Sequence, residues 1–191
     1  MLKVYTKVGD QGKTKQVTGK MVAKYDPQIQ TLGALDELQS WLGVTVANLS
    51  PACQGLEEKL IKLEREMYEL QADLVVKRHH TITLAEVTYM EEQIDAWTEE
   101  LPEMKEFILP GGSKTSANLQ YARALARTSE RVCVLYADES GEVKSDSLKY
   151  LNRLSDYLFV MARYANLLEG VADVKSKPAR PRRRPKNKLA N

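Results

Sequence analysis

Four charged side chains in one predicted helix have the spacing that anion binding requires. They are Arg123, Arg127, Glu130 and Arg131. Residues three or four positions apart share one side of a helix, so these groups lie together. Clustered guanidinium groups repel one another unless an anion, or acidic side chains from elsewhere, lie among them. The pattern therefore indicates either an anion site or an exposed, salt-bridged surface helix.

A Pro-Gly-Gly-Ser turn, residues 110–113, precedes this charged face. Ser113 is a candidate N-cap, because its hydroxyl can accept a hydrogen bond from a free amide of the first helical turn. We expect the helix to run from 113 to about 136. The turn would then fix where the arginine side chains point.

The N-terminal segment has a second anion-binding pattern, in TKVGDQGKT. Gly9 and Gly12 allow positive φ, so consecutive backbone amides can form an anion-binding nest. The surrounding cations and hydroxyls are Lys7, Lys13, Lys15, Lys24, Thr6 and Thr14. GDQGKT is not a P-loop, because only two residues separate its glycines. An ordinary flexible N-terminus is the alternative.

Apolar periodicity predicts five helices that would position these groups. We expect helices at 27–49, 56–74, 84–101, 113–136 and 146–169, with a turn near 138–141. The second has leucine or methionine alternating by four and three, which is typical of a helix packed in a bundle; a partner-binding zipper is the alternative. Residues 1–26 read as a loop with a short strand at 2–5. Without further strand alternation, the fold class is an all-α bundle.

Charge divides the chain into a body and a tail. The 191 residues carry a net charge of +2, but residues 170–191 contain eight Lys or Arg and one Asp. The body, 1–169, has 20 basic and 25 acidic residues and cannot bind nucleic acid through bulk charge. The tail has three prolines and few core residues, so we expect it to be disordered. It could bind nucleic acid or an acidic partner, act as a docking peptide, or promote solubility, and no base-stacking aromatics are interleaved with it.

Cysteine and hydropathy patterns limit the class of protein. Cys53 and Cys133 are far apart and lack a CxxC pattern, which fits two buried thiols in a reducing cytosol and no metal knuckle. His79 and His80 are adjacent, so they do not face each other on a helix. No segment has the length of apolar sequence that spans a membrane, and no signal peptide is evident. We expect a cytoplasmic protein.

Four blocks in order make the assignment more specific. TKVGDQGKT is followed by GALDEL at 33–38, by FILPGGS at 107–113 with the arginine face behind it, and by YLNRLSDY at 150–157. Their order and spacing resemble the PduO-type ATP:cob(I)alamin adenosyltransferases. The resemblance covers about 1–169. It implies a five-helix, ferritin-like bundle that assembles as a homotrimer, with active sites between subunits.

The resemblance also implies roles for individual residues. Thr6, Lys7, Gly9, Asp10, Gly12 and Thr14 would bind ATP, with Lys24 reaching the phosphates. Arg127 would bind triphosphate, and Arg123 would pair with Asp36 across the subunit interface. Glu130, Arg131 and Asn152 would lie at the nucleotide site. Phe107 would occupy the lower axial face of the corrin. Asp36 with Arg123 could instead be purely structural, Phe107 could be core packing, and Asn152 could bridge helices.

The implied reaction is attack of cob(I)alamin on the 5′ carbon of ATP, which releases triphosphate. Arg127, Lys24 and Mg²⁺ would stabilise the charge on this leaving group. Phe107 would exclude a lower ligand and so ease reduction of Co(II). The electron would come from a separate reductase, and the product would pass to an adenosylcobalamin-dependent enzyme.

Two positions depart from the family pattern. Many members have a second arginine after the position of Arg127 and a histidine at the position of Gln120, where this chain has Thr128 and Gln120. Some members close the corrin site with a C-terminal aromatic, which this tail lacks. A catalytically weak ATP- or cobalamin-binding paralogue, with a basic tail for docking, is therefore the alternative function.

Overall fold

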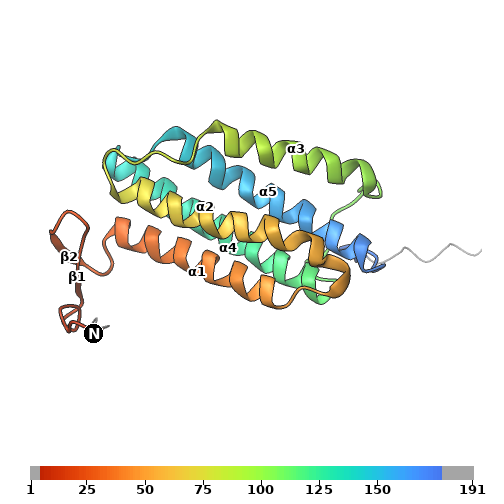
Figure 1. Ribbon diagram of the computed structural model, residues 1–191, viewed down its shortest axis with the longest axis horizontal. Helices are drawn as coiled ribbons and strands as arrows, with labels where there is room; N and C mark the ends of the chain where they lie inside the picture. The colour runs from red at the N-terminus through yellow and green to blue at the C-terminus, as the bar shows by residue number, and fades with distance from the viewer. Residues whose placement is uncertain (1–4, 178–191) are drawn as a thin grey trace, which may run out of the picture.

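Five long helices form the computed structural model (Figure 1), which describes residues 5–177. The helices are α1 (Pro27–Ala47), α2 (Glu57–Val75), α3 (Leu84–Glu100), α4 (Lys114–Ser140) and α5 (Ser145–Leu168), and a 3-10 helix, η1 (Pro51–Leu56), precedes α2. Helix α1 packs against α2 and α4, while α5 packs against α4 and α3. The predicted five-helix bundle is confirmed. None of the helices in residues 5–177 is long and apolar enough to cross a membrane.

Local capping explains where the helices begin and end. The Asp26 carboxylate accepts a hydrogen bond from the amide of Gln28, and Ser113 Oγ accepts one from the amide of Ser116 at 3.1 Å, so the predicted N-cap is confirmed. Helix α4 continues past the predicted end at 136 and stops at Ser140, because Gly141 adopts the left-handed conformation with φ of 66°.

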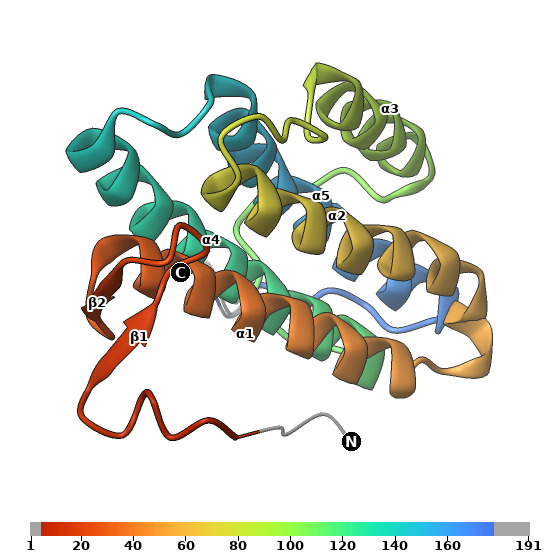
Figure 2. The same cartoon turned by 60° about the vertical axis from the view of Figure 1, so that its left-hand side comes forward.

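The N-terminal segment contains a hairpin that the sequence analysis missed. Strands β1 (Lys13–Lys15) and β2 (Met21–Ala23) pair antiparallel, with Thr14 opposite Val22. The hairpin lies beside the start of α1, outside the bundle (Figures 1 and 2). Strands of three residues with little apolar alternation give almost no sequence signal. The strand predicted at 2–5 falls largely outside the described residues, and Tyr5 is not in a strand.

The core is built from the apolar faces of the helices and also contains buried polar links between them. Leu35, Leu38 and Leu70 are fully buried, as are both thiols, Cys53 and Cys133. Burial raises the pKa of Cys133 to about 12, so this thiol stays protonated and unreactive near neutral pH. One of the buried polar links is made by the Tyr150 hydroxyl, which donates a hydrogen bond to Glu66 at 2.8 Å and so joins α5 to α2.

The segment after α5 is ordered where we expected disorder. Residues 170–177 follow the loop between α3 and α4, and Ile108 forms an antiparallel bridge with Lys175. The Asp173 carboxylate accepts a hydrogen bond from Arg163 at 2.7 Å. Residues 170–177 of the predicted tail thus have defined partners in the structure, and Asp173 pairs with the buried Arg163 of α5. Residues 178–191, which hold most of the basic tail, lie outside the described residues.

The side chain of Asn166 holds the turn that starts α4. Its Oδ1 accepts a hydrogen bond from the amide of Ser113 at 2.9 Å, and its Nδ2 donates one to the carbonyl of Gly111 at 3.3 Å. Gly111 and Gly112 have φ of 141° and 108°, which disfavour residues with a side chain. A Cβ on Gly112 would lie 2.3 Å from Asn166 Oδ1. The turn therefore requires glycine at residue 112 because the Asn166 side chain of α5 lies against it.

We predict that Gly112→Ala lowers the free energy of unfolding by about 2–3 kcal/mol, because it combines a strained φ with a steric clash. Urea denaturation at a fixed protein concentration measures this. Gly55→Ala is the control, because an added Cβ there meets open space; it should stay within about 1 kcal/mol of wild type. Equal effects of the two substitutions would contradict the proposed fit between the turn and Asn166.

Candidate active site

The arginine face of α4 is partly buried at one end and exposed at the other. Arg123 is half-buried and donates from Nε to Gln120 Oε1 at 2.9 Å, while Arg127 and Arg131 are exposed. Burial, and secondarily the positive charge of Arg127, lower the pKa of Arg123 from its usual value. An arginine remains charged at neutral pH even so, which makes this face strongly cationic.

Arg127 is the cation best placed to bind a ligand. Within residues 5–177 its guanidinium has no hydrogen-bond or ion-pair partner, whereas Arg131 donates to the Thr128 hydroxyl at 3.2 Å. Glu130 is engaged as well, since it accepts a hydrogen bond from Asn152 Nδ2 on α5 at 2.8 Å. The structure therefore brings Glu130 and Asn152 together, as neighbours of the arginine face.

Asp36 is exposed on α1, the helix that packs beside α4. The Ser129 hydroxyl donates to the carbonyl of Ala34 at 2.9 Å, so the two helices are in register near these residues. Within residues 5–177, Asp36 forms no ion pair with Arg123 of the same chain. The predicted partner of Asp36 belongs to a neighbouring subunit, which a single chain does not test.

The N-terminal loop at residues 6–14 contains two residues with positive φ, and Gly9 is not one of them. Gly12 has φ of 75°, and Lys7 is a non-glycine residue with φ of 61°, a strained conformation that often marks a functional loop. The carbonyl of Gly12 accepts a hydrogen bond from the amide of Lys24 at 2.9 Å. A Cβ on Gly9 would lie 3.3 Å from Lys24 Cε and Nζ, so the lysine side chain lies across the loop.

The other predicted nucleotide residues of this segment are on the same loop. Thr6 and Asp10 are exposed, and Thr14 is half-buried in β1. Within the described part of the chain, no hydrogen bond or ion pair joins residues 5–24 to Arg123, Arg127, Glu130 or Arg131. One subunit thus presents two separate cationic groups, the N-terminal loop and the arginine face of α4.

Phe107 lies just before the turn that starts α4, with 83% of its surface exposed. The alternative that Phe107 is a core residue is therefore wrong. A pocket of about 200 Å³ follows at the turn, lined by Pro110, Gly111, Gln120 and Arg123 among others. The aromatic ring and the arginine face are thereby positioned by the same turn and helix.

Some contacts around these groups were not found from the sequence. Gln120 had been noted only as a departure from the family pattern, yet its buried amide orients Arg123. Asn166 gave no signal, because nothing in a helical asparagine indicates that it holds a turn distant in sequence. Asp173 gave a weak sequence signal, because it is the single acidic residue in the basic tail.

No metal centre is evident among the described residues, where no group of three or more His, Cys, Asp or Glu side chains is placed to hold an ion. His79 instead contacts Asp73 at 2.6 Å, and Asp73 also accepts hydrogen bonds from the amides of Thr81 and Ile82. Burial raises the pKa of Asp73, but these hydrogen bonds outweigh it and lower the pKa below the usual value. This cluster fixes the loop between α2 and α3.

Comparison with known proteins assigns the chain to a family. The family described as cobalamin adenosyltransferase matches residues 4–165. The chain is 39% identical over 178 residues to the corrinoid adenosyltransferase of Bacillus subtilis, covering 91% of each. It is 34% identical to the corrinoid adenosyltransferase MMAB of Homo sapiens, covering 88% of this chain and 70% of that one.

Solved structures agree with this assignment. A PduO-type ATP:corrinoid adenosyltransferase from Lactobacillus reuteri, a phenylalanine-to-alanine variant complexed with cobalamin and ATP, superposes with a TM-score of 0.87 at 34% identity, covering 92% of this chain and all of that one. An arginine-to-lysine variant from the same organism, complexed with ATP, also gives 0.87, at 35% identity and 91% coverage of this chain. The chain therefore belongs to the PduO-type ATP:corrinoid adenosyltransferase family.

Proposed function

We propose that this chain transfers the adenosyl group of ATP to cobalamin, with ATP bound between the N-terminal loop of one subunit and the arginine face of its neighbour. The activity is that of its family, whose curated relatives are corrinoid adenosyltransferases. The observation that carries the site proposal is the exposed guanidinium of Arg127 on α4. On the same helix Gln120 orients Arg123, and the helix begins at the turn that follows Phe107.

Charge stabilisation is the chemistry that these side chains supply. Displacement of triphosphate from the 5′ carbon of ATP builds negative charge on the leaving group, and fixed cations lower the free energy of that transition state. Arg127 offers a planar pair of donors for phosphate oxygens, and Lys24 offers a point charge over the glycine loop. Thr6, Lys7, Asp10 and Thr14 would bind the remainder of the nucleotide, with the amides of Gly9 and Gly12.

Glu130, Arg131 and Asn152 complete the nucleotide side. The hydrogen bond from Asn152 to Glu130 links α5 to α4 and leaves the second carboxylate oxygen of Glu130 free to accept another donor, such as a ribose hydroxyl. Arg131, held by Thr128, adds positive charge one turn beyond Arg127. Thr128 therefore has a role beside the phosphates, although it cannot supply the cation that an arginine would.

The assembly that we propose is a homotrimer. Two features support contact between subunits: the loop and the arginine face are separate within one chain, and large apolar side chains are exposed on both. The exposed apolar residues include Tyr5, Val8, Val17 and Tyr25 in the N-terminal segment and Tyr121, Val134 and Leu135 on α4. Such apolar surface favours burial against another protein surface. Arg123 would then pair with Asp36 of the adjoining subunit.

Cobalamin would bind on the outer side of Phe107. An exposed aromatic ring without hydrogen-bonding atoms can cover the lower axial face of the corrin while donating no ligand to cobalt. A Co(II) centre that lacks its lower ligand is easier to reduce. A separate reductase would supply the electron, and an adenosylcobalamin-dependent enzyme would take the product.

Mg²⁺ fits this site as a companion of the triphosphate. Mg²⁺ prefers oxygen ligands and commonly binds through substrate phosphates. Because the described residues form no three-carboxylate or histidine cluster, we expect phosphate oxygens and water to supply most of its ligands. When bound, the ion would neutralise part of the phosphate charge.

Arg127→Ala should lower kcat/KM for ATP roughly 100-fold or more, because the transition state loses a fixed cation. Arg127→Lys should lose less, since it keeps the charge and loses only the paired donors. Single-turnover formation of adenosylcobalamin from ATP and chemically reduced cobalamin measures this. Lys149→Ala, at an exposed position on α5, is the control and should match wild type. If the activity of Arg127→Ala is within twofold of wild type, Arg127 is not part of the site. If the wild-type chain forms no product, the alternative of a catalytically weak ATP- or cobalamin-binding paralogue is favoured.

Mixed trimers provide a test of the shared site. Lys24→Ala and Arg127→Ala chains, each nearly inactive alone, should regain activity when they are co-assembled with different tags. If one chain supplies the loop and another supplies α4, roughly a quarter of the sites in random trimers contain both wild-type groups. Co-assembly of two differently tagged Lys24→Ala chains is the control, with no gain. Activity of the mixed sample equal to that of its parents would mean that each site uses one chain only.

A further inference from the structure

The loop that carries Phe107 is held from behind by the segment after α5. The amide of Leu109 donates to the carbonyl of Val174 at 2.7 Å, and the amide of Ser176 donates to the carbonyl of Phe107 at 2.8 Å. Ile108 and Lys175 lie between these bonds as an antiparallel pair. Phe107 is thus the one residue of the candidate site whose backbone is fixed by residues 171–177, which we call the strap.

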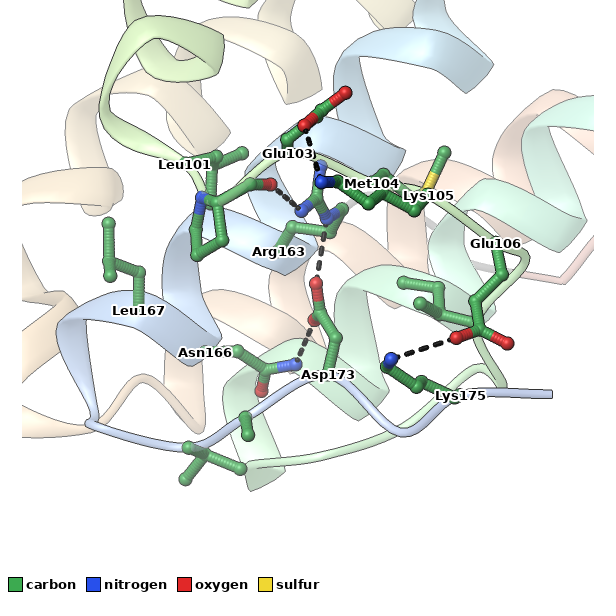
Figure 3. A pocket seen from close by; sticks show the side chains of 14 residues that line it. Leu101, Glu103, Met104, Lys105, Glu106, Arg163, Asn166, Leu167, Asp173 and Lys175 are labelled. Carbon is green, nitrogen blue, oxygen red and sulfur yellow. Dashed lines mark hydrogen bonds and ion pairs between the residues drawn. The ribbon is translucent and has the colours of Figure 1, made fainter. Parts of the chain in front are cut away.

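Backbone pairing sets the direction of the aromatic ring. Successive side chains of an extended segment point to opposite faces. Glu106 and Ile108 line a pocket of about 300 Å³ between the loop, the strap and the end of α5 (Figure 3). Phe107, which lies between them in sequence, is exposed and does not line that pocket. If the strap leaves, nothing in this pairing holds the ring on the outer face.

One buried cation fastens both the loop and the strap. The Arg163 side chain, only 8% exposed, donates from Nε to Asp173 Oδ2 at 2.7 Å and from Nη2 to the carbonyl of Pro102 at 2.8 Å. Figure 3 shows this guanidinium between the strap and the start of the loop. Buried charges are retained in proteins when they are paired and hydrogen-bonded, and Asp173 is the pairing group here.

The second oxygen of Asp173 connects the strap to the turn before α4. Asp173 Oδ1 accepts a hydrogen bond from Asn166 Nδ2 at 3.1 Å, and the same amide side chain holds Gly111 and Ser113. Both carboxylate oxygens therefore accept from donors on α5. The other side-chain link of the strap, Lys175 with Glu106, is largely exposed and contributes little.

We propose that Asp173 is a positioning residue for the corrinoid. By pairing with Arg163 and Asn166, it keeps the strap against the backbone of Phe107, so that the ring faces the lower side of the corrin. This inference rests on the proposed role of Phe107 in excluding the lower ligand of cobalt. Both oxygens of Asp173 accept from α5, so in this proposal it acts through the strap.

The substitution Asp173→Asn tests the positioning role, because it removes the charge and leaves the size and shape of the side chain nearly unchanged. An amide has one acceptor atom where the carboxylate has two, so one donor from Arg163 or Asn166 loses its partner. With cob(II)alamin and ATP, we expect the visible-spectrum signal of cobalt without its lower ligand to fall roughly tenfold. The Kd for ATP should stay within twofold. Hydrogen exchange at the amides of Leu109 and Ser176 should quicken roughly tenfold, while exchange in α1 stays as in wild type.

Lys175→Ala is the matched control, because it removes only the exposed ion pair of the strap; its spectrum should match wild type. If Asp173→Asn does not fold, Ser176→Pro serves instead. Proline removes the amide that donates to Phe107 without touching the buried pair, and it should reduce the spectral signal in the same way.

The outcomes separate this proposal from the role of Phe107. If Phe107→Ala loses the signal while Asp173→Asn and Ser176→Pro keep it, Asp173 has no positioning role and the proposed function stands. If Phe107→Ala keeps the signal, the role of Phe107 fails, and this inference fails with it. A parallel loss of ATP binding in Asp173→Asn would indicate general destabilisation and would also overturn the proposal.

Discussion

Repulsion among the arginine side chains on one face of α4 is the physical constraint on which the proposed site depends. Arg123, Arg127 and Arg131 lie along one face of α4, where burial, and secondarily the positive charge of Arg127, lower the pKa of Arg123. Such a face is favourable only when negative charge completes it, and triphosphate carries more of that charge than any side chain. Glu130, the carboxylate among these arginines, is partly engaged by Asn152. On the proposed function, triphosphate would supply this negative charge, and Gln120 already orients Arg123.

The bundle supplies that face with rigidity, and α5 contributes the most to it. Helix α5 packs against both α3 and α4, and its side chains reach three separate functional segments. Asn152 contacts Glu130, Asn166 holds the turn before α4, and Arg163 holds the loop and the strap. A long helix in the core is a suitable support, because a side chain fixed by packing positions its partner more closely than one on a loop.

Periodicity predicted the bundle well, because a seam of Leu60, Leu63, Met67 and Leu70 can be buried only against other helices. The hairpin at 13–23 was missed, since its strands are stabilised by pairing and turn geometry more than by apolar burial. The strap was missed for a related reason. Its composition predicts disorder, and its order comes from Arg163, ten residues earlier and buried in a helix. Long-range polar contacts of this kind leave no periodic signal.

For the candidate site, the sequence predicted which residues carry chemistry better than how they are held. The arginine spacing and the glycine loop were visible because anion binding requires particular residue types. The supporting side-chain amides of Gln120 and Asn166 could not be recognised from the sequence. A buried Gln or Asn looks the same in a sequence whether it orients another side chain or caps a helix. The exposure of Phe107 was equally invisible, because an aromatic residue beside a turn is as compatible with core packing as with a binding surface.

On the site that we propose, α4 and the turn before it would carry groups for both substrates. Attack on the 5′ carbon requires the cobalt atom, that carbon and the leaving oxygen to align, and small misplacements slow such reactions strongly. Phe107 is fixed to the start of α4 through the turn that Asn166 holds, and Arg127 lies about 20 Å further along the same helix. A packed helix bends little over that length, so the backbone that carries the two groups is held at one separation. Residues 171–177 contact the loop at 107–109. Within 5–177 they form no hydrogen bond or ion pair with the arginine face. On the proposed assignment, movement of the strap would therefore change the corrin side and leave the phosphate side intact.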